Sequence, residues 1–317
     1  MNKAISENPQ ARPPRPPVFQ RLRRNPVILK ELRSRMRGGR AFIILTIYLL
    51  IISAAISIVF LSFVASRNSV GGPDLGQALG KSIFGMVVGM ELFIIALIAP
   101  ALTAGAISSE REQQTYDLLR ATLLPARSLV SGKLASPLSY LFLLLFTGIP
   151  LQSLAYLFGG VAVEEIVIAN LILVVTAVAF CSVGLFFSSF TRRTLVSTVL
   201  AYAFVTLLLF GLPLFLITGI ALFQSLLTGT NVSASILAQT LLILGGWFII
   251  SLNPIATAIV TEVILIEEQS AFYFSLPLGP GNSVPIISPW ISFVIIYAFL
   301  SLLMVWLSIR FVRRVEK

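Results

Sequence analysis

The chain has 317 residues, of which 57% are hydrophobic and only 11% charged, with 23 lysines and arginines against 13 aspartates and glutamates. A soluble domain carries about 25% charged residues, so this composition excludes a water-soluble globular enzyme. The chain has no histidine and one cysteine, Cys181, which excludes histidine-ligated metal sites, an intrachain disulfide and a multi-thiolate zinc site. Apolar runs of about twenty residues instead predict an all-α integral membrane protein.

The first 40 residues are basic and fall into two parts. Residues 1–24 are rich in proline and arginine, a composition typical of a disordered cytoplasmic tail. Residues 25–40 place Ile28, Leu32 and Met36 at every fourth position among basic side chains. This pattern predicts an amphipathic helix in the inner headgroup layer; the alternative is a solvated tail. Because the segment adjoins a membrane span, we expect anionic lipid as its partner and no nucleic acid.

Six apolar runs are long enough to cross a bilayer. They cover residues 41–65, 83–107, 136–158, 166–187, 195–223 and 289–309. A further apolar stretch, residues 236–260, is interrupted by Asn253-Pro254 and is either a seventh span or a re-entrant or extracellular segment before the last span. We expect residues 41–317 to form one transmembrane domain.

The distribution of basic residues favours one of these topologies. With six spans, 21 of the 23 lysines and arginines lie on the inner side, and only Arg67 and Lys81 lie outside. With seven spans, the basic C-terminus moves to the outside. The positive-inside rule therefore favours six spans, with both termini cytoplasmic. A re-entrant backbone at 236–260 then has to be buried in protein or line a cavity.

The segment 108–133, between the second and third spans, is rich in charge. Ser109 and Glu112 have the spacing of a capping box, which predicts a short helix that begins at Ser109 and runs on to Arg120. We expect a second short helical piece over 127–133 that leads into the third span. The segment is either a compact docking element under the membrane or an ordinary solvated connector.

The same connection reads AISSEREQQTYDLLRATLLPAR from Ala106 to Arg127, and Gly132-Lys133-Leu134 follows. This string resembles the ABC-2-type permease subunit of ABC transporters. In that family a Gly/Ser-Glu-Arg-Glu-x-x-Thr-x-Asp/Glu-Leu-Leu motif ends the second span and forms the cytoplasmic coupling element that contacts the ATPase. The residues from Asn25-Pro26 to Arg37 are similar to the family's N-terminal interfacial helix. The order of the predicted spans is similar to its fold.

The resemblance implies a permease subunit that forms the membrane pathway for ATP-driven export of an unidentified substrate. The implied partners are an ABC ATP-binding subunit, which would hold ATP and Mg²⁺, and a second permease subunit in a homo- or heterodimer. The implied location is the plasma (inner) membrane of a prokaryote. The ATPase-coupling residues implied by the motif are Ser109, Glu110, Arg111, Glu112, Thr115, Tyr116, Asp117, Leu118 and Leu119.

The chain itself is expected to be no enzyme and to bind no cofactor. A P-loop needs G-x-x-x-x-G-K-[ST] between a strand and a helix, and the nearest match, Gly76–Ser82, is one residue short. Any energy from ATP is therefore expected to come from another polypeptide. The alternative function is a non-transporting membrane anchor or scaffold for a cytoplasmic ATPase in envelope assembly or signalling.

Three residues of the second predicted span are candidate functional positions. Glu91 is an acid inside a span, and such residues are functional candidates by default. It either lines the pathway or contacts a cationic substrate group, or, as the structural alternative, it lies near the outer interface or is bonded between helices. Gly85 and Gly89 share one helix face and allow close helix approach, either within the subunit or between two permeases.

Overall fold

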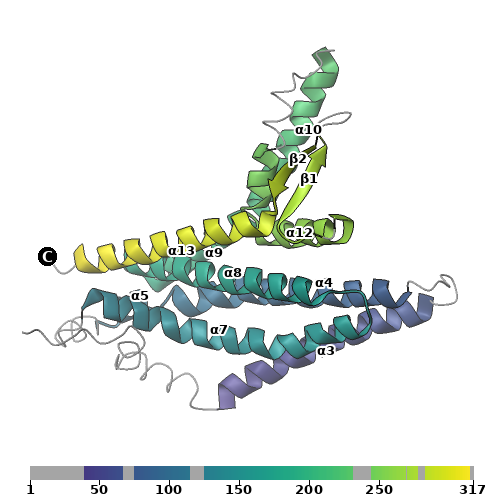
Figure 1. Cartoon of the computed structure of the whole chain (residues 1–317). Helices are drawn as coiled ribbons and strands as arrows, with labels where there is room; N and C mark the ends of the chain where they lie inside the picture. The colour runs from purple at the N-terminus through teal and green to yellow at the C-terminus, as the bar shows by residue number, and fades with distance from the viewer. Residues whose placement is uncertain are drawn as a thin grey trace, which may run out of the picture.

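The computed structural model of the chain describes residues 39–66, 75–114, 125–230, 244–268, 270–277 and 283–314. These residues form a bundle of long helices, beside which a short β-hairpin rises (Figure 1). Six helices of the described part are long and apolar enough to cross a membrane, which confirms the predicted class of all-α integral membrane protein. The basic tail 1–24, and the predicted interfacial helix apart from its last two residues, lie outside the described residues.

The elements follow one another in the order of the predicted spans. The bundle helices are α3 (Gly39–Ser66), α4 (Leu75–Thr103), α7 (Ala126–Leu157), α8 (Val163–Phe190), α9 (Thr194–Thr206) and α13 (Pro289–Arg314). The remaining elements are α5 (Ser108–Glu112), the π-helical segment η1 (Leu207–Gly211), α10 (Leu212–Thr230), a short helix Leu244–Ile250, α12 (Pro254–Glu268), β1 (Tyr273–Pro277) and β2 (Ser283–Ile287). α9, η1 and α10 together form the fifth long helix.

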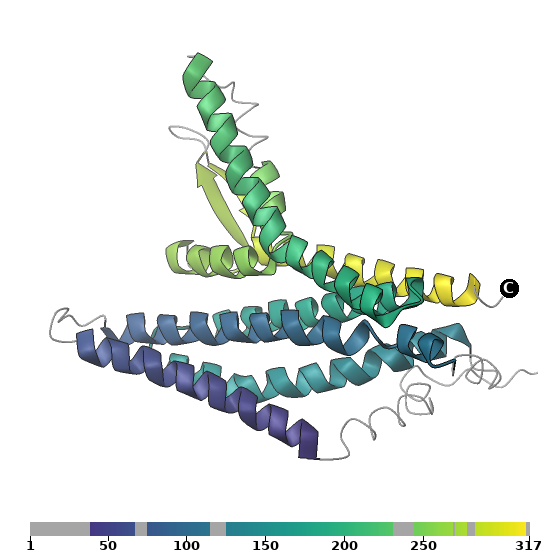
Figure 2. The same cartoon turned by 180° about the vertical axis from the view of Figure 1, so that it is seen from behind.

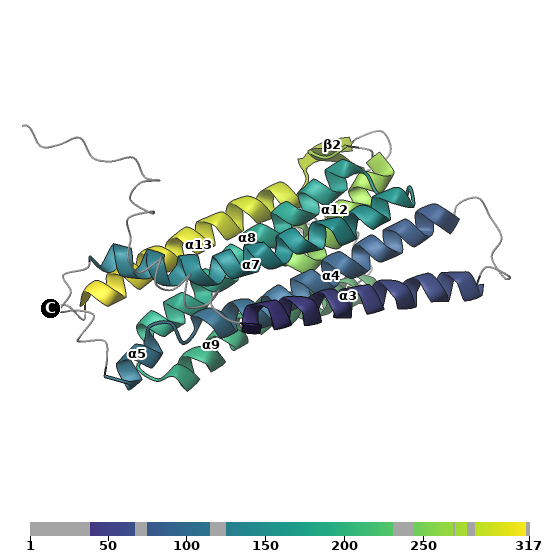
Figure 3. The ribbon, with the colours of Figure 1, turned by 90° about the horizontal axis from the view of Figure 1, so that it is seen from below.

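The central helix of the bundle is α8, which packs against α4, α7, α9 and α13. Figure 3 shows α4, α7, α8 and α13 side by side. The run from Ala179 to Leu185 in α8 is completely buried, because its small and apolar side chains suit a helix surrounded on all sides. A Cβ on Gly184 would lie 2.1 Å from Thr103 Oγ1, so only glycine lets the end of α4 approach this closely.

The outer helices expose apolar side chains, as expected for a protein that faces lipid. In α3, Phe42, Leu50 and Leu61 are each more than 60% exposed, whereas Tyr48 and Ile52 are buried against the bundle. Lipid tails accept such side chains without the free-energy cost that water would impose. The exposed face of α3 is therefore consistent with membrane insertion.

Two helix boundaries differ from the sequence prediction. α4 begins at Leu75, not near Ile83, and so takes Lys81 into the helix. The predicted helical piece 127–133 is helical and leads into the third span, but it is not a separate element, because α7 runs without a break from Ala126 to Leu157. Pro125 is extended and immediately precedes α7, and no residue between it and the third span interrupts the helical hydrogen bonds.

The antiparallel β-hairpin was not expected from the apolar pattern. β1 pairs with β2 from Tyr273 opposite Ile287 to Pro277 opposite Ser283. Aromatic and β-branched side chains favour these extended segments. The hairpin joins α13 through Trp290 Nε1, which donates a hydrogen bond to the Ala271 carbonyl oxygen at 2.6 Å. Seen from behind, α10 and the hairpin rise from the bundle while α9 lies along it (Figure 2).

The stretch predicted as re-entrant is a broken helix where it is described. The helix Leu244–Ile250 and α12 meet at a bend of 114°, which is too sharp for one straight crossing. Asn253 lies at the break and is 1% exposed. Its Oδ1 accepts a hydrogen bond from the Ala256 amide at 2.9 Å and so caps the start of α12. Residues 236–243 of the predicted segment lie outside the described residues.

Hydrogen bonds connect the break to two neighbouring helices, η1 and α13. Asn253 Nδ2 donates hydrogen bonds to the carbonyl oxygens of Leu208 and Leu209 in η1, at 2.7 and 2.8 Å. Tyr297 of α13 donates its hydroxyl hydrogen to the Leu252 carbonyl oxygen at 2.8 Å. A π-helical segment disturbs the regular helical hydrogen bonds, and Asn253 provides donors to carbonyls there. The irregular backbone is thus buried in protein, as a membrane requires.

Candidate functional site at the connection between α4 and α7

The backbone turns sharply after α4 and is held there by α8. Residues 104–107 form a turn, and α5 follows at Ser108. Ser188 of α8 is completely buried, and its Oγ accepts hydrogen bonds from the amides of Ile107 and Ser108 at 2.8 and 3.0 Å. The first amides of a helix have no partner within the helix. The free amides at the start of α5 are therefore bound by a side chain that lies 80 to 81 residues further along the chain.

The predicted capping box is wrong. Ile107, not Ser109, precedes the first residue of α5, and no side chain of α5 caps it. Ser109 Oγ donates to the Gly105 carbonyl oxygen at 2.5 Å. The helix ends at Glu112, and Gln114 has a φ of 56°, a left-handed conformation that does not continue a helix. Tertiary contacts thus replace the local cap that the spacing of Ser109 and Glu112 indicated.

Glu110 connects α5 to α7. Its Oε1 lies 2.5 Å from the Nζ of Lys133, and the two side chains are only 18% and 13% exposed. An ion pair with so little solvent around it is screened less by salt than a surface pair. Lys133 lies in the Gly132-Lys133-Leu134 string of the sequence motif, so the motif contains both partners of this pair.

Arg111 and Glu112 contact the link between α8 and α9. Arg111 Nη1 donates to the carbonyl oxygen of Thr191, the residue that follows α8, at 3.4 Å. The two carboxylate oxygens of Glu112 accept hydrogen bonds from the amide and the hydroxyl of Thr194, at 3.1 and 2.6 Å. Thr194 is the first residue of α9. A carboxylate is favoured at this position, because the N-terminus of a helix carries partial positive charge and unpaired amides.

The three consecutive residues Glu110, Arg111 and Glu112 therefore bind three different parts of the bundle: α7, the end of α8 and the start of α9. A displacement of α5 would pull on all three at once. Sequence reasoning selected these residues, but it missed Thr191 and Thr194, which bind Arg111 and Glu112, and Ser188, which binds the amides at the start of α5. No local signal could identify those partners, since they lie 80 to 82 residues away in the chain.

The other predicted coupling residues lie outside the described part of the chain. Thr115, Tyr116, Asp117, Leu118 and Leu119 belong to 115–124, whose arrangement the structure does not describe. Their coupling role stays a prediction. Among the described residues, no group of three or more metal-ligating side chains occurs.

Glu91 is bonded between helices at the core of the bundle. It is 0% exposed, and its carboxylate accepts hydrogen bonds from Tyr48 Oη of α3 at 3.1 Å and from Gln152 Nε2 of α7 at 2.6 Å. Gln152 Oε1 in turn accepts a hydrogen bond from Asn170 Nδ2 of α8 at 2.6 Å. These contacts join α3, α4, α7 and α8, so the geometry corresponds to the inter-helix alternative for Glu91.

Gly85 and Gly89 do not pack against any helix of the described part. A Cβ built on either residue meets no atom within 4 Å. Both instead line a cavity of about 370 Å³ between α4, α8 and α12. Packing within the subunit, one of the two predicted roles for this pair, is therefore not found among the described residues.

Comparison with known proteins identifies one family. The family model described as "ABC-2 family transporter protein" matches residues 26–314. The match includes every described element from α3 to α13, and it includes the connection that holds Glu110, Arg111 and Glu112. The comparison with curated proteins finds no match.

Proposed function

This chain belongs to the ABC-2 family of transporter proteins, and from this premise we propose that it forms the membrane pathway for export driven by a separate ATP-binding subunit. As a member of this family it is a multi-pass permease component of an ABC transporter. Export as the direction, the identity of the ATP-binding subunit and a second permease subunit belong to the proposal. So do the prokaryotic plasma membrane as location and the cytoplasmic position of both termini.

The observation that supports the proposal most strongly is the set of contacts made by the Glu110-Arg111-Glu112 triplet. Each residue of the triplet binds a different part of the bundle: α7, the residue after α8, and the start of α9. A subunit that pushes on the α4–α7 connection would move α7, α8 and α9 together. The triplet is therefore suited to convert movement of an ATP-binding subunit into movement of the helices that line a pathway.

The sequence that most nearly matches a P-loop supports a separate ATP-binding subunit. Residues Gly76–Ser82 lie in the first turns of α4 and are helical. A P-loop wraps phosphates with the free amides of a loop between a strand and a helix. In a helix that begins at Leu75, the amides from Leu79 onward bond to carbonyls four residues earlier, so Gly80, Lys81 and Ser82 do not present the free amides of a P-loop.

We expect reversal of the Glu110–Lys133 pair to separate coupling from assembly. Glu110→Lys or Lys133→Glu places like charges together in a poorly solvated site. Each is expected to reduce the rate of coupled ATP hydrolysis roughly tenfold, which corresponds to about 1.4 kcal/mol, a part of the cost of a disrupted buried pair. The double variant Glu110→Lys/Lys133→Glu restores the attraction and is expected to recover most of the rate. The measurement is ATP hydrolysis by the complex reconstituted in nanodiscs.

Equal rates for the two single variants and the wild type would contradict this role of the pair. Loss of the co-purified ATP-binding subunit in all three variants would instead assign the pair to assembly. The matched control is Arg127→Glu, which reverses an exposed charge in the first turn of α7. It is expected to leave the rate within about twofold of wild type, as is usual for exposed charges.

The proposed function itself is tested by purification and by an accessibility measurement. Purification of the full chain in mild detergent is expected to recover an ATP-binding subunit. A cysteine introduced at Gly89, in a Cys181→Ala background, is expected to change its reaction rate with a membrane-impermeant thiol reagent when a non-hydrolysable ATP analogue is added. A constant rate would favour the scaffold alternative, and recovery of no ATP-binding subunit would overturn both functions.

A further inference from the structure

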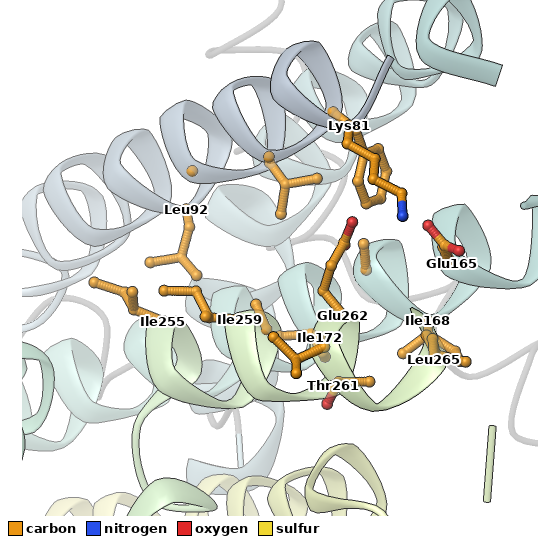
Figure 4. A pocket seen from close by; sticks show the side chains of 17 residues that line it. Lys81, Leu92, Glu165, Ile168, Ile172, Ile255, Ile259, Thr261, Glu262 and Leu265 are labelled. Atoms are coloured by element: carbon orange, nitrogen blue, oxygen red, sulfur yellow. The ribbon is translucent and has the colours of Figure 1, made fainter. Parts of the chain in front are cut away.

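The cavity between α4, α8 and α12 combines long apolar walls with a charged end. Its volume is about 370 Å³, and Figure 4 shows its walls formed by residues such as Leu92, Ile172 and Ile259. The charged side chains Lys81, Glu165 and Glu262 come from three different helices and converge at one end. α12, which forms one wall of the cavity, lies toward the end of the bundle opposite α5 (Figure 1). Its lining therefore changes from apolar to charged along its length.

Acidic side chains outnumber basic ones at this end. Two carboxyl groups, of Glu165 and Glu262, lie beside the one ammonium group of Lys81. Glu165 Oε2 is buried and has no hydrogen-bond partner among the described residues. A buried acceptor without a partner is costly unless a ligand supplies a donor. The charged end is therefore complementary to a cationic group that donates hydrogen bonds.

The apolar part of the cavity owes its space to two glycines. Gly85 and Gly89 lie on the α4 wall, and a Cβ at either position meets no atom within 4 Å. Larger side chains at these positions would project into the empty space. Two positions of the α4 wall thus carry no side chain, although glycine in a helix interior costs about 1 kcal/mol relative to alanine.

We propose that this cavity binds an amphiphile with a primary ammonium head group, which donates hydrogen bonds to Glu165 and Glu262, while its hydrocarbon body lies along Gly85, Gly89 and the apolar walls. Lys81 balances one of the two carboxylates, so that one cation completes the charge of the site. This inference rests on the proposed export function in one respect: it takes the bound amphiphile to be the class of substrate that the transporter exports. The binding site itself is testable without transport.

The test uses a dodecylammonium probe that carries a photoactivatable diazirine near the end of its chain. The full-length protein is placed in phosphatidylcholine nanodiscs, irradiated with increasing probe, and the labelled peptides are identified by mass spectrometry. We expect saturable labelling of α4, α8 and α12. A dodecanol probe and a dodecyl phosphate probe with the same diazirine are the head-group controls, and both are expected to bind more weakly.

Charge variants test the head-group part of the proposal. Glu165→Gln and Glu262→Gln are each expected to weaken binding of the ammonium probe about fivefold, the effect of losing one partly buried charge contact. Neither is expected to change labelling by dodecanol. Lys81→Met removes the competing cation and is expected to strengthen binding of the ammonium probe. Equal binding of all three probes by all variants would show a groove for lipid chains only and overturn the proposal.

A volume variant tests the hydrocarbon part. Gly89→Leu projects a side chain into the cavity from a position whose Cβ meets no atom within 4 Å, and it is expected to abolish saturable labelling by the ammonium and the alcohol probe alike. The matched control is Gly219→Leu in α10, another glycine whose Cβ meets no atom within 4 Å but which lies outside the cavity. It is expected to label as wild type. Undiminished labelling of Gly89→Leu would place the bound probe elsewhere and overturn the proposal.

The outcome separates this inference from the proposed function. If an ATP-binding subunit is recovered and the Gly89 cysteine responds to nucleotide, but the ammonium probe shows no preference, only the substrate class is wrong. If the probe binds as expected and no ATP-binding subunit is recovered, the site exists and the export function fails.

Discussion

Gly148→Ala is expected to be among the most destabilising single substitutions in the bundle. A Cβ at this position of α7 would lie 1.8 Å from Glu91 Oε1 and 2.8 Å from Tyr48 Oη. Both atoms belong to the buried hydrogen-bond network that joins α3, α4 and α7. Overpacking at this contact and the loss of hydrogen bonds in a site without water together predict a loss of about 4 kcal/mol in the free energy of unfolding.

The measurement is unfolding in mixed micelles titrated with dodecyl sulfate, followed by circular dichroism. Gly85→Ala is the matched control, because a Cβ there meets no atom within 4 Å. It is expected to stabilise the protein by up to about 1 kcal/mol, the difference in helix propensity. If Gly148→Ala behaved like Gly85→Ala, the close approach of α4 and α7 at Glu91 would be refuted.

Glu91→Ala provides the second arm of the Gly148 experiment. Removal of the carboxylate frees the space that the added methyl group of Gly148→Ala needs, although Tyr48 and Gln152 lose their acceptor. The two substitutions share one contact, so their effects are expected to be non-additive. We expect the double variant to be more stable than the sum of the two single losses implies. Strict additivity would show that Gly148→Ala acts through some other contact.

The second large effect is expected at Asn253, whose side chain both caps α12 and donates hydrogen bonds to the π-helical segment η1. Its Oδ1 caps α12, and its Nδ2 donates to the Leu208 and Leu209 carbonyl oxygens in η1. Asn253→Asp keeps an equally good cap but places a carboxylate oxygen against two carbonyl oxygens. The unfolding free energy is expected to fall by about 3 kcal/mol, because buried acceptors are left without donors.

Asn253→Ala and the aspartate variant together separate the two roles of Asn253. The alanine variant loses both the cap and the donated hydrogen bonds, so it is also expected to be unstable. If the cap alone mattered, Asn253→Asp would unfold like wild type and only Asn253→Ala would be weakened. Hydrogen–deuterium exchange of the η1 amides provides a local readout, and faster exchange is expected in both variants.

The apolar pattern predicted the helices but not their long-range contacts. Hydropathy placed all six long helices, because a bilayer requires about twenty apolar residues per span. Asn253-Pro254 marked the break before α12, since a proline cannot donate to the preceding helix. The short helix after α4 was expected, but its capping was assigned to Ser109 and Glu112, whereas Ser188 supplies it. Local spacing cannot show that a distant side chain competes for the same amides.

The candidate residues of the second span show the same limit. Glu91 was recognisable as a functional or structural candidate because a carboxyl group in a membrane span needs partners. Its partners Tyr48 and Gln152 lie 43 and 61 residues away and follow only from the way the helices pack. Gly85 and Gly89 looked like a packing motif, yet the structure leaves them beside a cavity. A glycine spacing indicates that close approach is allowed, not that a helix occupies the space.

The amino-acid sequence by itself determined the class of protein, the number and order of the long helices and the family motif at the α4–α7 connection. These properties depend on the apolar content and order of local segments, because each segment must by itself be long and apolar enough to cross the bilayer. Only the tertiary structure decided which groups meet: Glu112 with Thr194, Asn253 with η1, and Lys81 with two carboxylates at the end of a cavity. Such contacts depend on the relative positions of the helices, and those positions result from many contacts between residues that are distant in the sequence.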